Sequence, residues 1–150
     1  MRITVVGGGA WGTALASHCA RAGLAVRTWI REPELVAALN ERHENPAFLP
    51  GVALPQGMRA TTRLDEAVAD AEAILVVVPS EYCRSIYHQL GALAPKGAIL
   101  VSATKGLEIE TLRRMSELAG AEAPGHPVAV LSGPSFAAEV AAGLPTAVVV

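Results

Sequence analysis

Short runs of continuous apolar residues recur along this chain, each rich in β-branched residues and bounded by Gly, Pro or Ser. The runs lack polar alternation, which indicates strands buried on both faces, as in a parallel sheet. The pattern predicts strands at residues 3–6, 25–30, 73–78, 98–101, 127–131 and 146–150. A shorter strand is expected at 58–61, after a loop at 45–57 that contains three prolines and two glycines.

Between these runs, apolar residues recur at the spacing of a helix face. Gly23 is placed to end the first helix, and Pro33 fits the first turn of the second. Three helices are expected around Leu15, Cys19 and Ala22, around Leu35, Val36 and Leu39, and around Leu112, Met115 and Leu118. The alternation of strand and helix predicts an α/β fold with a doubly wound, mostly parallel sheet and helices on both faces.

Composition and charge narrow the functional classes. The 150 residues fit one domain, and a net charge of -2 without any Lys/Arg run argues against nucleic acid or an anionic membrane as partner. No apolar run approaches the roughly 20 residues that span a bilayer, so no membrane insertion is expected. Cys19 and Cys83 stand alone, which argues against a disulfide framework or a zinc site and favours a cytoplasmic location. The four histidines lack metal or triad spacing.

The first predicted strand leads directly into a glycine-rich turn, Gly7-Gly8-Gly9-Ala10-Trp11-Gly12. Its G-x-G-x-x-G spacing, between a strand and a helix, is typical of a Rossmann-like dinucleotide-binding unit. Gly7 would permit the tight turn, Gly9 would let a pyrophosphate approach the backbone, and Gly12 would let the helix pack on the strand. A purely conformational role for the glycines is the weaker alternative, because a second buried strand completes the unit.

The end of the second strand normally carries the residue that reads the ribose of the cofactor. Here it reads Ile30-Arg31-Glu32. Arg31 would pair with the 2′-phosphate of NADP, whereas Glu32 would repel that phosphate unless it points away. A solvated surface arginine is the alternative. The sequence therefore favours NADPH and tolerates NAD.

Beyond the glycines, the chain resembles the bacterial-type NAD(P)-dependent glycerol-3-phosphate dehydrogenases over nearly its whole length. The resemblance rests on ordered segments, which are far more specific than the glycines alone. They are Gly7–Ala16, Asn45–Gly51, Val77–Ser80, Thr104–Glu108 and Leu131–Ala137, followed by Glu139 and Val140.

The resemblance implies roles for individual residues. Ala10, Trp11, Arg31, Lys105, Phe48 and Ala137 match positions that contact the cofactor, and Lys105, Gly133 and Ser135 match positions that contact the substrate. Lys105 would be shared between the two sites. Two departures stand out: Phe48 replaces a frequent tyrosine, and Glu32 stands where a second basic residue is common.

Position along the chain supports two of these assignments. Lys105 follows a strand, where ligands of a doubly wound sheet lie, and could neutralise alkoxide charge or orient a ketone oxygen. A snorkelling surface lysine is the alternative. Ser135 is placed as the N-cap of a helix that starts near Ala137, and Gly133 would admit a small substrate close to the backbone.

The resemblance implies hydride transfer between nicotinamide C4 and C2 of sn-glycerol 3-phosphate or dihydroxyacetone phosphate, which feeds glycerophospholipid synthesis. The partner is then a small phosphorylated three-carbon substrate, and the longer protein could form a homodimer. The acid/base lysine would lie in a C-terminal helical domain beyond residue 150, so residues 1–150 should form the N-terminal dinucleotide-binding domain and bind cofactor weakly without turnover. Two alternatives are a related hydroxy-acid or ketone reductase and a non-catalytic NAD(P)-sensing regulatory module.

Overall fold

A computed structural model describes all 150 residues and shows one six-stranded parallel sheet. The strands are β1 (Arg2–Val6), β2 (Ala25–Trp29), β3 (Arg59–Thr61), β4 (Ala73–Val76), β5 (Ile99–Ser102) and β6 (Val128–Val130). Their order across the sheet is β3-β2-β1-β4-β5-β6, so the chain first adds strands on one side of β1 and then, from β4 on, reverses to the other side. This order confirms the predicted doubly wound sheet. In such sheets ligands bind at that reversal, beyond the carboxyl ends of the strands.

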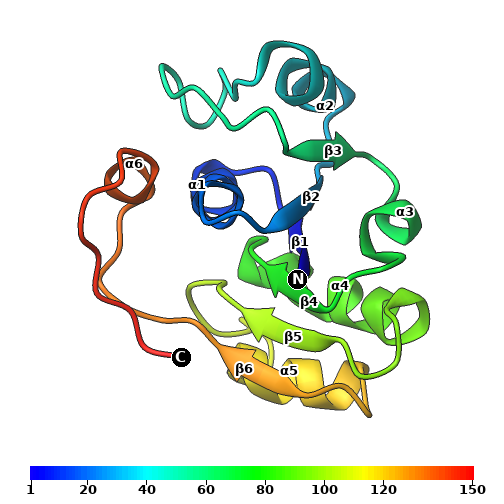
Figure 1. Ribbon diagram of the computed structural model, residues 1–150. Helices are drawn as coiled ribbons and strands as arrows, with labels where there is room; N and C mark the ends of the chain where they lie inside the picture. The colour runs from blue at the N-terminus through cyan, green and yellow to red at the C-terminus, as the bar shows by residue number, and fades with distance from the viewer.

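Helices cover both faces of the sheet (Figure 1). They are α1 (Ala10–Arg21), α2 (Pro33–Ala37), α3 (Leu64–Val68), α4 (Ser80–Leu93), α5 (Met115–Glu122) and α6 (Ala137–Ala141), with a π-helical turn at Ala38–Arg42 directly after α2. One apolar cluster joins α1, α2 and the π-helical turn to the sheet, and a second joins α3, α4 and α5 to the opposite face. None of the helices is long and apolar enough to cross a membrane.

The alternation of side chains along β1 explains this two-sided core. Ile3 and Val5 belong to the cluster on the α1 side, whereas Val6 belongs to the cluster on the α4 side. Successive side chains of a strand point to opposite faces, so a strand buried on both faces is apolar throughout. A third, smaller cluster packs α6 against α1 through Ala14, Val140 and Ala141, away from the sheet.

The predicted strand boundaries agree with the structure to within one or two residues for six of the seven strands. The seventh prediction, a strand at 146–150, is wrong. That segment forms a single antiparallel bridge, in which Ser132 and Val149 exchange hydrogen bonds of 2.9 and 2.7 Å. Val148, Val149 and Val150 are exposed. The neighbouring strand β6 is only three residues long, so the segment has no strand with which to form a longer ladder of backbone hydrogen bonds.

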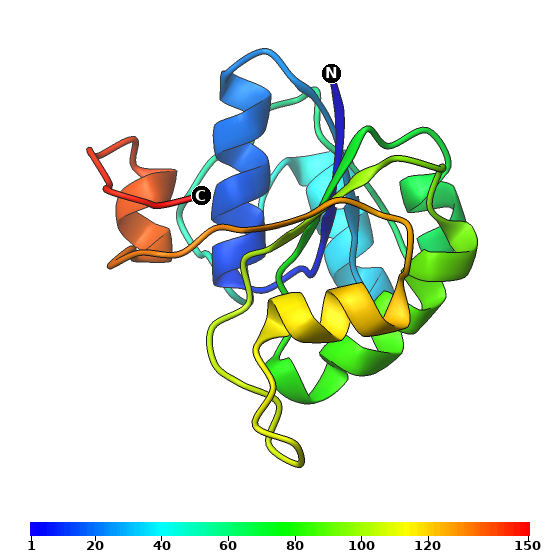
Figure 2. The ribbon, with the colours of Figure 1, turned by 90° about the horizontal axis from the view of Figure 1, so that it is seen from below.

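The helices differ more from the predictions. Gly23 follows the end of α1 with a φ of +82°, and Pro33 begins α2, as expected. The helix expected around Leu112 begins only at Met115, because Leu112 lies in an exposed loop with a φ of +56°. That loop, between β5 and α5, projects from the body of the molecule (Figure 2). The longest helix, α4, was not among the expected elements.

Candidate functional site

The turn between β1 and α1 has the geometry that its three glycines predict. Gly7 has a φ of +132°, and a Cβ there would stand 2.5 Å from the carbonyl oxygen of Val77. A Cβ on Gly12 would collide with the carbonyl oxygen of Gly7, so this glycine lets α1 lie against the turn. Around the Cβ position of Gly9 no atom lies within 4 Å. Gly7 and Gly12 are thus required by the protein's own packing, whereas Gly9 faces open space.

The first turn of α1 presents unpaired amide groups. The helix begins at Ala10 with Gly9 as its N-cap, and no side chain caps it. The first backbone bond of the helix is donated by the Thr13 amide to Gly9 O, at 2.9 Å, so the amides of Gly9, Ala10, Trp11 and Gly12 have no acceptor in the protein. Free amides at the positive end of a helix bind anions.

A cavity of about 330 Å³ adjoins this turn. Its wall contains Gly7, Gly8 and Gly9, the ends of β2 and β4, and two residues named by the sequence, Arg31 and Phe48. The structure therefore brings three separately predicted parts of the site together. The cavity is completed by Trp29, Glu32, Val77, Val78, Pro79, Tyr82, Ser85 and Ile86.

Sequence reasoning missed the wall that α4 contributes to this cavity. Tyr82, Ser85 and Ile86 all lie on that helix, which was not predicted. The available signal was the segment Val77–Ser80, since residues just beyond a buried strand at the reversal point are expected at a ligand site.

Arg31 and Glu32 form an ion pair at the rim of the cavity. The Arg31 Nε and Nη2 atoms each lie 3.1 Å from Glu32 Oε1. The Arg31 side chain is 72% exposed, so it is free to turn toward a ligand. In this conformation Glu32 does not point away but accepts from the arginine, and the positive charge of Arg31 is neutralised.

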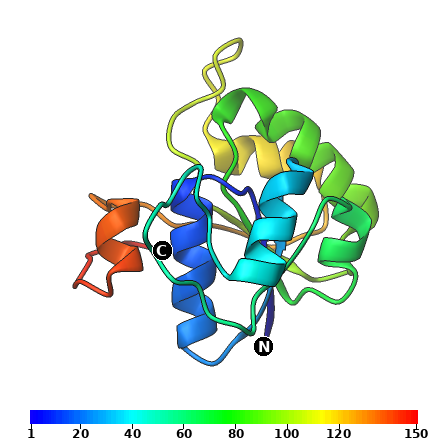
Figure 3. The same cartoon turned by 90° about the horizontal axis from the view of Figure 1, so that it is seen from above.

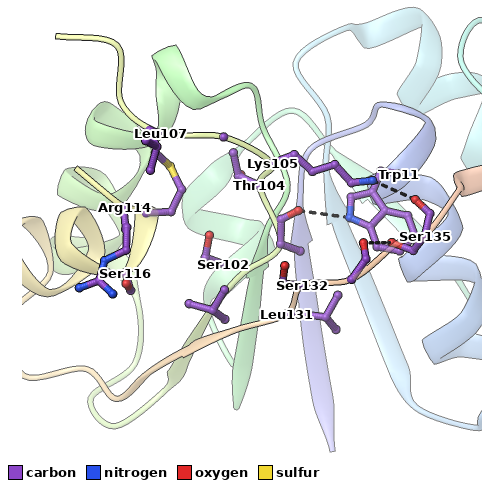
Figure 4. Close-up of a pocket in the computed structure, with 15 residues that line it drawn as sticks. Trp11, Ser102, Thr104, Lys105, Leu107, Arg114, Ser116, Leu131, Ser132 and Ser135 are labelled. Carbon is purple, nitrogen blue, oxygen red and sulfur yellow. Dashed lines mark hydrogen bonds between the residues drawn. The ribbon is translucent and has the colours of Figure 1, made fainter. Parts of the chain in front are cut away.

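A second cavity, of about 530 Å³, lies between the ends of β5 and β6 (Figure 4). It contains all three predicted substrate-contacting residues, Lys105, Gly133 and Ser135, together with Trp11. Lys105 Nζ donates to Ser135 O at 2.9 Å and lies 5.6 Å from the centre of the Trp11 ring. These contacts hold the lysine at the site, which argues against a freely snorkelling side chain.

One prediction in this region is wrong. Ser135 is not the N-cap of α6, because Phe136 occupies that position without a side-chain bond, and Ser135 Oγ instead donates to Gly133 O at 3.4 Å. Gly133, with a φ of +154°, is required by the backbone, since a Cβ there would lie 2.6 Å from Ala147 O. Ala137 lines neither cavity and packs with Ala10 and Trp11 in the small cluster around α6.

Residues before and after Lys105 in the sequence are held in place by hydrogen bonds. On one side, Thr104 Oγ1 donates to the carbonyl oxygen of Val78 at 2.9 Å. On the other, the buried carboxylate of Glu108 accepts from Arg84 Nε at 2.7 Å and from Nη2 at 2.8 Å. This arginine and a second hydrogen bond, from Thr111, lower the pKa of Glu108 below its ordinary value of 4.5. The segment that carries Lys105 is thereby tied at one end to the residues between β4 and α4 and at the other end to α4 itself.

Comparison with known proteins agrees with this geometry. The family described as NAD-dependent glycerol-3-phosphate dehydrogenase N-terminus matches residues 2–150. The glycerol-3-phosphate dehydrogenase (NAD(P)+) of Rhodospirillum rubrum is 53% identical over 97% of this chain and 42% of its own length, and that of Caulobacter vibrioides is 49% identical over 98% and 44%. The crystal structure of the Coxiella burnetii glycerol-3-phosphate dehydrogenase superposes with a TM-score of 0.91 and 37% identity, over 98% of this chain and 45% of that one.

The chain therefore spans less than half the length of these relatives, and the matched family is described as their N-terminal part. The glycine turn, the free helix amides and the adjoining cavity fit the NAD dependence that the description of the matched family names. The chain belongs to the glycerol-3-phosphate dehydrogenase family, as its N-terminal, NAD-dependent part.

Proposed function

We propose that this chain is the cofactor-binding part of an NAD(P)-dependent glycerol-3-phosphate dehydrogenase. The observation that carries the proposal is the group of four unpaired amides at Gly9–Gly12, which adjoins open space and the cavity of about 330 Å³. A pyrophosphate suits this position because it accepts several hydrogen bonds and carries negative charge. Membership of an NAD-dependent family over residues 2–150 supports the same class of ligand, a nicotinamide dinucleotide.

In this proposal the bound dinucleotide supplies the hydride, and the residues of the chain bind and orient the reactants. Gly7, Gly9, Ala10, Trp11 and Gly12 form the cradle for the pyrophosphate. Arg31 and Phe48 flank the nucleoside end, since both line the cavity next to the glycine turn.

Lys105, Gly133 and Ser135 form the substrate side of the proposed site. The ammonium group of Lys105 stabilises negative charge on the oxygen at C2 of dihydroxyacetone phosphate, and Gly133 and Ser135 contact the substrate from the facing loop. We assign the proton donor to a lysine beyond residue 150, in keeping with the greater length of the relatives. Residues 1–150 then bind cofactor weakly and do not turn over substrate.

The finer parts of the proposal follow from the same residues. NADPH is favoured over NADH because Arg31 can reach a 2′-phosphate, with Glu32 reducing the preference. A cytoplasmic location is inferred because both cysteines are free thiols. The longer protein is proposed to form a homodimer and to supply glycerol 3-phosphate for glycerophospholipid synthesis.

Calorimetric titration of the chain with NADPH and NADH tests the proposal, and Gly9→Val provides the decisive variant. A Cβ at Gly9 meets no protein atom, so the fold should survive while the pyrophosphate is excluded, and we expect affinity to fall at least about tenfold. Gly120→Ala, also in open space but on α5, is the matched control and should bind normally. Equal binding by the Gly9 variant would place the cofactor elsewhere.

The substrate assignment needs the longer protein. With dihydroxyacetone phosphate and NADPH, the nicotinamide absorbance should fall, and Lys105→Met should reduce that rate. If another ketone is consumed while dihydroxyacetone phosphate is not, the reductase alternative is favoured. If Lys105→Met and Ser135→Ala leave all activity intact, the sensing module is favoured.

A further inference from the structure

A buried asparagine, Asn45, connects the glycine turn with the loop that carries Phe48. It lies at the start of the long segment between the π-helical turn and β3, and this segment crosses the N-terminal end of α1 (Figure 3). The residue is 1% exposed. No prediction from the sequence gave it an individual role. Every polar atom of its side chain has a partner in the protein.

The Nδ2 group of Asn45 donates to two acceptors on the cradle. One is the carbonyl oxygen of Gly8, at 2.8 Å, and the other is Thr13 Oγ1, also at 2.8 Å. Thr13 Oγ1 in turn donates to the same Gly8 oxygen at 3.3 Å. The Gly8 carbonyl is therefore held from two sides by side chains that are themselves buried.

Fixing this carbonyl fixes the neighbouring amide. The peptide bond between Gly8 and Gly9 is trans, so its C=O and N–H groups point in opposite directions. With Gly8 O held toward Asn45 and Thr13, the N–H of Gly9 must point away from them, and it has no acceptor in the protein. Without such a hold, a glycine pair could rotate this peptide at little cost.

The other end of the Asn45 amide controls a second part of the site. Its Oδ1 accepts from the backbone N–H of Phe48 at 3.1 Å, and its carbonyl oxygen accepts from Leu49 N at 3.0 Å. Phe48 is half exposed and lines the same cavity as Gly8 and Gly9. One side chain thus fixes both the anion-binding peptide and the aromatic residue across the cavity.

We propose that Asn45 is a positioning residue for the dinucleotide site, which aims the Gly9 amide at the pyrophosphate and ties the Phe48 turn to the cradle. The inference rests on the proposed function for the identity of the ligand. The orientation of the Gly9 amide and the position of the Phe48 turn are properties of the free protein, so they can be tested without any ligand.

The chain contains a matched control in Asn40. This side chain also bonds to backbone at both ends, with Nδ2 donating to Ala60 O at 2.9 Å and Oδ1 accepting from Ala60 N at 2.8 Å. It anchors β3 to the π-helical turn and lines neither cavity. Asn40→Ala therefore removes the same number of backbone contacts away from the site.

The experiment compares Asn45→Ala, Thr13→Val and Asn40→Ala by calorimetric titration with NADPH, thermal unfolding and amide NMR of the free chain. We expect Asn45→Ala to weaken NADPH binding about tenfold or more, Thr13→Val to weaken it less, and Asn40→Ala to leave it within about twofold despite a comparable fall in Tm. The amide signals of Gly9 and Phe48 should shift in Asn45→Ala and not in Asn40→Ala. Thr13→Val preserves side-chain shape and gives the answer if Asn45→Ala does not fold.

Two outcomes separate this inference from the proposed function. If the unaltered chain binds neither NADPH nor NADH, the proposed function fails, while shifted Gly9 and Phe48 signals would still support the positioning role. If the unaltered chain binds and Asn45→Ala binds equally well, or if the two amide signals do not move, the inference is overturned.

Discussion

At the scale of single residues, Gly7, Gly9 and Gly12 are needed for different reasons although they belong to one motif. A side chain at Gly7 would meet the carbonyl of Val77, one at Gly12 would meet the carbonyl of Gly7, and Gly9 faces open space. The sequence predicted this division because the roles follow from the strand, turn and helix around the motif. It could not predict the role of Gly133, since the residue that crowds it, Ala147, is distant in sequence.

The ion pair of Arg31 with Glu32 makes a prediction about cofactor preference. In Glu32→Gln the guanidinium loses its partner and the ribose end loses a negative charge, so the ratio of NADH to NADPH dissociation constants should rise about three- to tenfold. Calorimetric titrations with both cofactors at low ionic strength measure the ratio. Glu34→Gln, in the first turn of α2 just after Glu32 and without an ion pair, is the control. An unchanged ratio in Glu32→Gln would mean that Arg31 does not read the ribose.

At the scale of elements, strands were easier to predict than helices, and the reason lies in particular residues. β1 and β4 are buried on both faces, so from Ile3 onward their residues are apolar except Thr4, whose hydroxyl donates to Ala67 O. α4 was missed although its buried residues, Cys83, Ile86, Tyr87 and Leu90, recur at the spacing of a helix face and could have predicted it. The apolar run at 146–150 was misleading, since a strand depends on a partner that the local sequence does not reveal.

The link between α4 and the segment after β5 should appear in the pH dependence of stability. Arg84 lowers the pKa of Glu108 in the folded state, so the ion pair stabilises the fold above pH 4.5 and loses this effect as pH falls through the folded-state pKa. In Glu108→Gln, unfolding free energy should be lower at neutral pH and should change less in acid. Urea unfolding between about pH 3 and pH 7 measures this.

Glu110→Gln provides the comparison for that experiment, because Glu110 is exposed in the same loop and forms no ion pair. It should retain the acid dependence of the unaltered chain. Identical curves for Glu108→Gln and the unaltered chain would show that the Arg84 contact contributes nothing to stability.

At the scale of the whole molecule, the fold depends on two apolar layers that meet only through the sheet. Tyr87 is the largest fully buried side chain of the layer under α4, and its hydroxyl has no hydrogen-bond partner. Burial raises the pKa of Tyr87 to about 12, against a smaller lowering by the neighbouring Ser102 hydroxyl, whose geometry falls short of a hydrogen bond. A phenolate is therefore strongly disfavoured in the folded state.

Because the Tyr87 phenol is buried in the folded state, the free energy of unfolding should depend on pH in alkaline solution. The stabilisation of the neutral form is complete below pH 10, the ordinary pKa, and is lost as pH rises toward about 12. Tyr87→Phe should remove that alkaline dependence and, by deleting an unpaired buried hydroxyl, raise unfolding free energy by about 1 kcal/mol at neutral pH. Chemical unfolding across this range measures both effects. Tyr82→Phe, at an exposed position, should change neither, and a destabilised Tyr87→Phe would contradict the prediction.

The hydrogen bond from Lys105 to the carbonyl of Ser135 joins the segment that follows β5 to the segment that follows β6. Replacing this lysine would remove a charge and would also release the backbone that presents Gly133 and Ser135. A kinetic deficit at position 105 therefore combines lost electrostatics with a displaced loop. Because the acceptor is a backbone carbonyl, no substitution at Ser135 removes it, and comparison of Lys105→Met with the cationic Lys105→Arg is needed to divide the measured deficit between these two origins.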